Sequence, residues 1–333
     1  MKLIAETAWH HEGDFDFMKN LVSKISTISK ADIIKMHITL NFDEYMHKNH
    51  VSYKSLKSKL FNKDQWIKLA DIARENNKEL MLLLNDIDAI NFGISLNPEY
   101  IEIHSVCLND IFLLQELKKN ISKKTKIVLG VGGSDISEIQ QAINYLDNKN
   151  IILMFGFQNY PTIYEDVNLL KIKKMMQMFK DFEFGYADHT SWDNENNELI
   201  TVIGASSGVK YVEKHVTTNY GEERIDWSSA ISIEMFNKLK NKLDILIKLN
   251  GNGLLSMNAA EKKYSIYGPM KKTAVLKKNL SKDSKLKLDD IKFIRTSEIS
   301  DISQLNIINY IGTKINENLK KDTVLKLNHL KNN

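Results

Sequence analysis

The sequence predicts an α/β fold in which a (β/α)8 TIM barrel is followed by a small, mostly β domain. Eight short runs rich in Ile, Val and Leu alternate with amphipathic segments between residues 3 and 249. Eight strand–helix units of this size match a closed barrel far better than an open, doubly wound sheet. No G-x-G-x-x-G motif opens the first unit, which argues against a dinucleotide-binding sheet.

The predicted strands are apolar runs that each end in a polar turn, and the segments between them have helical periodicity. The strands are Leu3–Ala5, Asp32–Ile38, Glu79–Leu84, Tyr100–Ile103, Lys126–Leu129, Ile151–Phe155, Glu183–Tyr186 and Val209–Val212. The main helices are Phe15–Ile28, Lys63–Asn76, Ile111–Lys119, Ile136–Leu146, Leu169–Phe179, Glu198–Ala205 and Ile233–Leu249.

The pattern changes after Leu249. Two glycines in the sequence Asn-Gly-Asn-Gly at 250–253 break the last helix, and a short helix at 257–264 leads to Gly268-Pro269,. Short alternating runs separated by Lys, Asp and Ser follow from residue 271. We therefore predict a barrel domain at 1–250, a linker at 251–270 and a small β domain at 271–333.

Composition limits the classes of protein to consider. Hydrophobic residues make up 43% of the chain and charged residues 26%, which is typical of globular proteins,. A single cysteine, Cys107, allows no internal disulfide, and no run of 18 apolar residues occurs, so we expect a cytoplasmic protein without a membrane segment. The net charge of +4 arises in residues 271–331, where 14 basic residues face 7 acidic ones without aromatic interleaving. This pattern favours a solvated surface over a nucleic-acid site.

A barrel of this class carries its active site at the carboxyl ends of the strands. A carboxylate, ammonium groups and several imidazoles are predicted to gather there, which suits metal-assisted chemistry on a polar small molecule. The residues at these ends are Glu6, Lys35, His37, Asn85, Asp86, His104, Ser105, Gly130–Gly133, Gln158–Tyr160, Asp188, His189, Lys214 and His215.

Two of these histidines form a candidate metal site. His189 and His215 each stand at the polar end of an apolar run. Neighbouring strands lie about 4.8 Å apart, so the two rings can converge on one ion. The alternative is that each ring only caps its strand through hydrogen bonds. Acidic neighbours of both histidines, Asp188 and Glu213, favour the metal interpretation.

The segment Gly130-Val-Gly-Gly133 allows two interpretations. A glycine-rich strand end can bring backbone N–H groups close to an anion. The turn can also serve geometry alone, because Ser134-Asp135 is positioned to cap a helix that begins near Ile136,.

At this point the motifs resemble a known family. The opening Ala5-Glu6-Thr-Ala-Trp-His-His-Glu-Gly13 resembles the A-E-I-G-x-N-H-x-G opening of the sialic acid (N-acetylneuraminate) synthase family, which includes legionaminic and pseudaminic acid synthases. Tyr160-Pro-Thr162, Gly185-Tyr-Ala-Asp-His-Thr190, Glu213-Lys-His215 and Asp226 follow in the family's order. The C-terminal domain resembles the family's antifreeze-like (SAF) domain, with Arg295 in its K-R-P-G position.

The resemblance implies a metal-dependent condensation, usually with Mn²⁺, of phosphoenolpyruvate with the aldehyde of an N-acylated amino sugar, giving a nine-carbon 2-keto-3-deoxy sugar acid. It also implies a domain-swapped homodimer in which Arg295 completes the site of the partner subunit. The implied roles are metal binding for His189 and His215, catalysis for Glu6, Lys35 and Asp226, and substrate binding for His37, Ser105, Gly130, Gln158, Tyr160 and Arg295.

The departures from the family pattern cluster at its phosphate site. Glu102 stands where the family has a lysine, Gly130-Val-Gly-Gly133 replaces S-T-G-M, and Ala187 replaces a serine. A carboxylate in place of an ammonium group reverses an attraction to the phosphate. Two hypotheses follow: an active synthase of this type, or a divergent relative that binds metal and sugar without using phosphoenolpyruvate.

Overall fold

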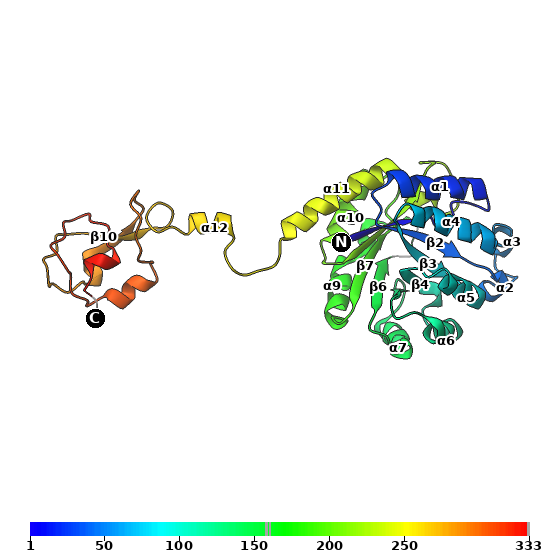
Figure 1. Cartoon of the computed structure of the whole chain (residues 1–333), viewed down its shortest axis with the longest axis horizontal. Coiled ribbons are helices and arrows are strands. Elements are labelled where there is room, and N and C mark those ends of the chain that lie inside the picture. Colours follow the sequence, from blue (N-terminus) through cyan, green and yellow to red (C-terminus); the bar gives the residue numbers. More distant parts are fainter. Residues whose placement is uncertain (157–158, 160, 332–333) are drawn as a thin grey trace. The chain divides into compact units, whose positions relative to one another are not determined.

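The computed structural model describes all residues except 157–158, 160 and 332–333. The chain forms two compact units, Met1–Gly251 and Asn252–Asn333 (Figure 1). Each unit has its own hydrophobic core. In the part of the chain that the structure describes, no helix combines the length and the apolar character that a bilayer crossing requires.

The first unit is a closed barrel of eight parallel strands, as predicted. Each strand pairs with the next one in the sequence, and β1 also pairs with β8, which closes the sheet. The strands are β1 (Lys2–Glu6), β2 (Ile33–Ile38), β3 (Glu79–Leu84), β4 (Tyr100–Ile103), β5 (Lys126–Gly130), β6 (Ile151–Gly156), β7 (Glu183–Asp188) and β8 (Tyr211–Thr217).

Helices surround this barrel (Figure 1), and side-chain caps set several of their starts. Asp14, Asn62, Asp86, Asp110 and Asp135 each accept a hydrogen bond from a backbone N–H of the first turn,. The longer helices are α1 (Phe15–Ile28), α4 (Lys63–Glu75), α5 (Ile87–Ser95), α6 (Ile111–Asn120), α7 (Ile136–Leu146), α9 (Leu169–Met178), α10 (Asn197–Ala205) and α11 (Ile233–Asn250). The short ones are α2 (Phe42–Tyr45), α3 (Tyr53–Lys57) and α8 (Tyr164–Val167). The short helix α12 (Ala259–Tyr264) belongs to the second unit.

The last barrel strand differs from its predicted range. β8 begins at Tyr211 and continues to Thr217, so His215 lies inside the strand rather than beyond its end. The reason is that β1 pairs with β8 as far as His215, and a short additional strand, β9 (Ile231–Ser232), pairs with Val216 and Thr217 beyond it. Both pairing partners lie elsewhere in the chain, and the local pattern at Val209–Val212 gives no sign of them.

The side chains of the strands alternate between two cores. One face packs against the helices, and the other fills the barrel with residues that include Ile4, Ile33, Val128 and Met154. At the amino end of the barrel, the rings of Tyr100 and Tyr211 meet edge to face, 5.8 Å apart. The interior is therefore packed at its amino end, and a site can form only toward the carboxyl ends of the strands.

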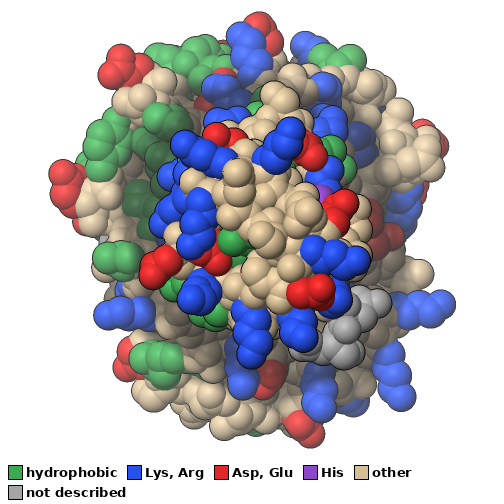
Figure 2. Space-filling view, turned by 90° about the vertical axis from the view of Figure 1, so that its left-hand side faces the viewer, with side chains coloured by type: hydrophobic (Ala, Val, Ile, Leu, Met, Phe, Trp, Pro, Cys, Tyr) green, Lys and Arg blue, Asp and Glu red, His purple; other side chains and the backbone are tan. Residues whose placement is uncertain are grey.

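The second unit contains an antiparallel hairpin of β10 (Thr273–Leu276) and β11 (Ile291–Ile294). Its core includes Leu276, Leu286, Ile291, Ile315 and Leu325. In Figure 2, Lys and Arg side chains are spread over the visible face and mixed with acidic ones, and they do not form a single stripe. Several lysines of the second unit are paired with acidic residues, among them Lys278 with Asp290 and Lys292 with Asp322.

Candidate active site

The candidate active site continues the barrel interior toward the carboxyl ends of the strands. Because side chains two residues apart share a face of a strand, an apolar residue deep in the barrel is followed by a polar one nearer the mouth. Thus Ile4 precedes Glu6, Ile33 precedes Lys35, Tyr100 precedes Glu102, Ala187 precedes His189, and Tyr211 precedes Glu213, which is followed by His215.

The ammonium group of Lys35 lies among three carboxylates. Its Nζ is 2.8 Å from Glu102 Oε2, 3.0 Å from both oxygens of Glu213 and 3.5 Å from Glu6 Oε1. All four side chains are at least 96% buried. A lysine has three N–H donors, and here carboxylate oxygens surround them. We call Glu6, Lys35, Glu102 and Glu213 the lysine cage.

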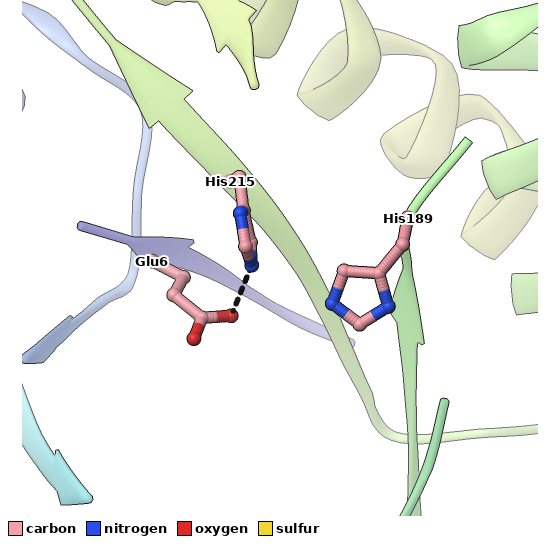
Figure 3. A group of neighbouring side chains, drawn as sticks. All are labelled: Glu6, His189 and His215. Atoms are coloured by element: carbon pink, nitrogen blue, oxygen red, sulfur yellow. Dashed lines mark ion pairs between the residues drawn. The ribbon is translucent and has the colours of Figure 1, made fainter. Parts of the chain in front are cut away.

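Glu6 links this cage to the two histidines predicted as metal ligands. Its Oε2 lies 3.2 Å from His215 Nε2, the contact drawn as a dashed line in Figure 3. The rings of His189 and His215 are 5.0 Å apart, and one potential ligand atom from each of Glu6, His189 and His215 lies within 4.8 Å of the others. The predicted convergence of the two imidazoles is therefore present, with a carboxylate as a third donor.

The donor set of these three residues fits a divalent transition metal. Imidazole nitrogen and carboxylate oxygen suit ions such as Zn²⁺, Fe²⁺ and Mn²⁺. Metal-binding histidines must be neutral. Burial together with His215 lowers the pKa of His189 to about 3. Glu6 raises the pKa of His215 against the effect of burial, so a metal that binds His215 must displace a proton from it. Burial alone would raise the pKa of Glu6, but Lys35 and His215 hold that pKa well below its usual range, so Glu6 is ionised.

The carboxyl groups of the lysine cage differ in how readily they hold a proton. Burial opposes the charge on Lys35, but Glu102 and Glu213 raise its pKa well above the ordinary value. The pKa of Glu213 is itself well above the carboxylate range because of burial and the nearby Glu6. Glu213 is therefore the carboxyl of the cage that holds a proton most readily, while Glu6 stays ionised.

The loop after β1 is tied to the loop after β8. Asp226 Oδ2 accepts a hydrogen bond from Trp9 N at 3.0 Å, and Arg224 Nε donates to the carbonyl oxygen of His10 at 2.6 Å. His10 Nδ1 lies 2.9 Å from the carbonyl oxygen of Ile225, and the His10 ring meets that of His215 edge-on at 5.7 Å. Asp226 is thus close to His215. Burial lowers the pKa of His215, but Glu6 and, to a smaller extent, Asp226 raise it above its ordinary value.

Of the other predicted site residues, some belong to the barrel, two lie outside the described residues, and one belongs to the second unit. His37 contacts Glu6 Oε1 through its Nε2. Gly130 ends β5 so close to the turn after β4 that a Cβ atom there would lie 2.8 Å from the backbone N of Ser105. Gln158 and Tyr160 lie outside the described residues. Arg295 belongs to the second unit, where its guanidinium donates to the carbonyl oxygen of Pro269.

The space beside the triad of Glu6, His189 and His215 is small and polar. A cavity of about 20 Å³ is lined by the lysine cage, His104, Ser105, Gly130 and His189, among others, which is room for roughly one water molecule. A larger cavity of about 140 Å³ adjoins it through Gly132, Gly156, Ala187 and His189, and its walls include the apolar Val131, Phe155 and Ile172.

The sequence places Glu102 at the family's phosphate position and Glu213 beside a candidate metal ligand, but it predicts no catalytic or binding role for either. Glu102 interrupts an apolar strand, and Glu213 stands two residues before His215. The two-residue period of a strand places both on the interior face, and this was the signal that could have identified them.

Comparisons with known proteins identify relatives of the whole chain. A model of the NeuB family matches residues 18–254. An uncharacterised protein of Methanocaldococcus jannaschii is 27% identical over 97% of this chain and 92% of its own length. The N,N'-diacetyllegionaminic acid synthase of Legionella pneumophila is 25% identical over 98% of this chain and 94% of its own length. The crystal structure of an N-acetylneuraminic acid synthetase from Leptospira borgpetersenii, in complex with citrate, has a TM-score of 0.71 and 24% identity, covering 78% of this chain and 88% of that chain.

Proposed function

Because the chain belongs to the NeuB family, we propose that it is a metal-dependent synthase that condenses phosphoenolpyruvate with the aldehyde of an N-acylated amino sugar. The product is a nine-carbon 2-keto-3-deoxy sugar acid, and water is consumed as phosphate leaves. The observation that carries this proposal is the convergence of Glu6, His189 and His215 at the mouth of the barrel. The synthase names of relatives that match over nearly the whole chain support it.

The residues of the site have distinct roles in this reaction. A divalent ion, Mn²⁺ in this proposal, held by Glu6, His189 and His215 would supply a Lewis acid for the aldehyde oxygen. Bond formation between C3 of the enolpyruvate and the aldehyde carbon leaves negative charge on that oxygen, and it must be protonated. Glu213 can supply a proton, because its pKa is raised,. Lys35 orients the carboxylates around it, and the loop that carries Asp226 holds the β1 loop in place.

Metal binding is the first test. His189→Ala and His215→Ala each remove one imidazole, and we expect Mn²⁺ binding to fall at least tenfold in calorimetry with the full chain. His47→Ala, in an exposed loop, is a matched control. Unchanged Mn²⁺ affinity in either site variant would refute the ligand assignment. Phosphate release across a panel of N-acylated amino sugars then tests the reaction itself.

A second candidate function is favoured by the lysine cage. The donors of Lys35 already face three carboxyl groups, and a phosphate that approached them would meet the Glu102 carboxylate at short range. Like charges at this distance in a buried site repel by several kcal/mol. The alternative is a divergent NeuB protein that binds metal and sugar but performs other carbonyl chemistry, or only binds a carbohydrate.

Calorimetry with phosphoenolpyruvate separates the two candidates. A synthase binds phosphoenolpyruvate at micromolar to millimolar concentration in the presence of Mn²⁺, whereas the divergent protein gives no heat. Glu102→Gln removes one negative charge and keeps the shape of the side chain. If the unchanged chain gives no heat and Glu102→Gln gains measurable affinity, the carboxylate is the cause and the second candidate holds.

The second unit has a proposed role in the same function. We propose that residues 271–333 form an SAF domain, joined by a linker at 251–270, and that the chain is a domain-swapped homodimer in which Arg295 reaches the sugar of a partner subunit. The family resemblance supports this proposal. Arg295→Ala should lower the synthase rate at least tenfold while thermal unfolding stays unchanged. An intact rate, or a monomer in light scattering, would count against it.

A further inference from the structure

A buried polar network lies on the outer face of β7 and β8, away from the barrel interior. Lys214 Nζ is 2.7 Å from Asp188 Oδ2, and these side chains are 0% and 1% exposed. Asp188 Oδ1 accepts hydrogen bonds from Thr190 N at 3.0 Å and from Thr190 Oγ1 at 2.6 Å. The hydroxyl of Thr201, in α10, donates to Asp188 Oδ2. We call these four residues the strand clamp.

The strand clamp lies directly behind the two candidate metal ligands. Asp188 precedes His189 and Lys214 precedes His215, and Asp188 and Lys214 are paired in the ladder between β7 and β8. The ion pair therefore joins the two strands at the residues that precede the imidazoles. Thr201 adds a third anchor from α10, and Asn197 Nδ2 of the same helix donates to the carbonyl oxygens of Thr190 and Ser191 at 3.1 and 2.7 Å.

Stability alone is a poor explanation for such a network. Taking two charges out of water costs several kcal/mol for each ion, and well-packed apolar residues of similar volume often stabilise a protein equally well or better. The clamp consists of a full ion pair and three hydrogen bonds to one carboxylate. Ion pairs and hydrogen bonds depend on direction, whereas apolar contacts do not. The strand clamp therefore fixes the lateral position of each strand end, which an apolar contact would not do.

We propose that Asp188 and Lys214 are positioning residues that hold His189 and His215 at the separation needed to bind one metal ion, with Thr201 fixing the orientation of the Asp188 carboxylate. Residues behind metal ligands commonly have such a role, and their loss typically lowers metal affinity 10–100-fold. This inference rests on the metal site of the proposed function and does not depend on which substrates are used.

The test compares variants that keep the fold but lose the ion pair or a hydrogen bond of the strand clamp. In the double variant Asp188→Asn with Lys214→Met, the charges are removed together, so no unpaired ion is buried. Thr201→Val deletes one hydroxyl, and Thr201→Ser restores it. We expect the double variant and Thr201→Val to bind Mn²⁺ 10–100-fold more weakly than the unchanged full-length chain in calorimetry, and Thr201→Ser to bind within threefold of it.

A control variant at the opposite end of the barrel shows whether a loss of stability alone can lower Mn²⁺ affinity. Lys126→Met breaks the ion pair with Glu183, far from the strand clamp along β5 and β7. We expect it to lower the unfolding temperature without changing Mn²⁺ affinity.

Equal Mn²⁺ affinity in the double variant and the unchanged chain would overturn the inference and leave the proposed function standing. Failure of the unchanged chain to bind Mn²⁺ at millimolar concentration would overturn both. Weakened Mn²⁺ binding together with an absence of phosphoenolpyruvate binding would support the clamp and refute only the synthase reaction.

Discussion

At the scale of single residues, Gly130 shows how closely the end of β5 approaches the turn that follows β4. A Cβ atom at this position would lie 2.8 Å from the backbone N of Ser105, and a backbone atom cannot swing aside as a side chain does. We expect Gly130→Ala to lower the free energy of unfolding by about 1–3 kcal/mol, the usual cost of overpacking. Urea denaturation measures this change, and an unaltered midpoint would mean that the segment at Ser105 shifts without cost.

Single residues also show what could and could not be predicted from the sequence. Glu6, His189 and His215 could be predicted as site residues because each stands where an apolar run turns polar, a local signal. The contact of Glu102 with Lys35 could not, because 67 residues separate the two in the chain and only the register of three neighbouring strands brings them together. Pairings of this kind depend on tertiary structure, which no local pattern encodes.

At the scale of elements, α7 shows a start signal that the sequence identified correctly. Asp135 accepts a hydrogen bond from Glu138 N, and Glu138 Oε2 accepts one from Asp135 N, which forms a capping box. We expect Asp135→Ala to destabilise the protein by about 1 kcal/mol. Chemical denaturation provides the measurement, with Gln141→Ala, at an exposed position of the same helix, as the control. A larger loss for the control than for Asp135→Ala would show that the cap does not set the helix start.

β7 also carries an acid-sensitive contact at its amino end. Burial raises the pKa of Glu183, but hydrogen bonds from Lys126, Lys210 and Tyr211 lower it from 4.5 to about 2. A depressed pKa means that the contact stabilises the folded protein fully above pH 4.5 and progressively less as the pH falls toward 2. Since Glu183 and its lysine partners are partly exposed, we expect Glu183→Gln to cost no more than about 1 kcal/mol at pH 7 and almost nothing near pH 2. Unfolding curves at the two pH values would reveal a constant difference if this account is wrong.

At the scale of the whole molecule, the two units have separate cores. Glu6, His189 and His215 all belong to the first unit. We therefore expect a chain truncated after Gly251 to unfold cooperatively and to bind Mn²⁺ with the affinity of the full chain, as measured by calorimetry. A loss of metal binding on truncation would mean that the second unit contributes to the metal site itself.

Closure of the sheet by pairing of β1 with β8 also affects how the protein folds while it is being synthesised. Lys2 pairs with Tyr211 and Glu6 with His215, so the first strand to leave the ribosome must wait, unpaired on one side, until more than two hundred further residues have been made. Contacts between such distant parts of a chain form slowly, and an open strand edge invites association with other chains during the delay. Nascent chains that stall before β8 should therefore be the ones that depend most on chaperones.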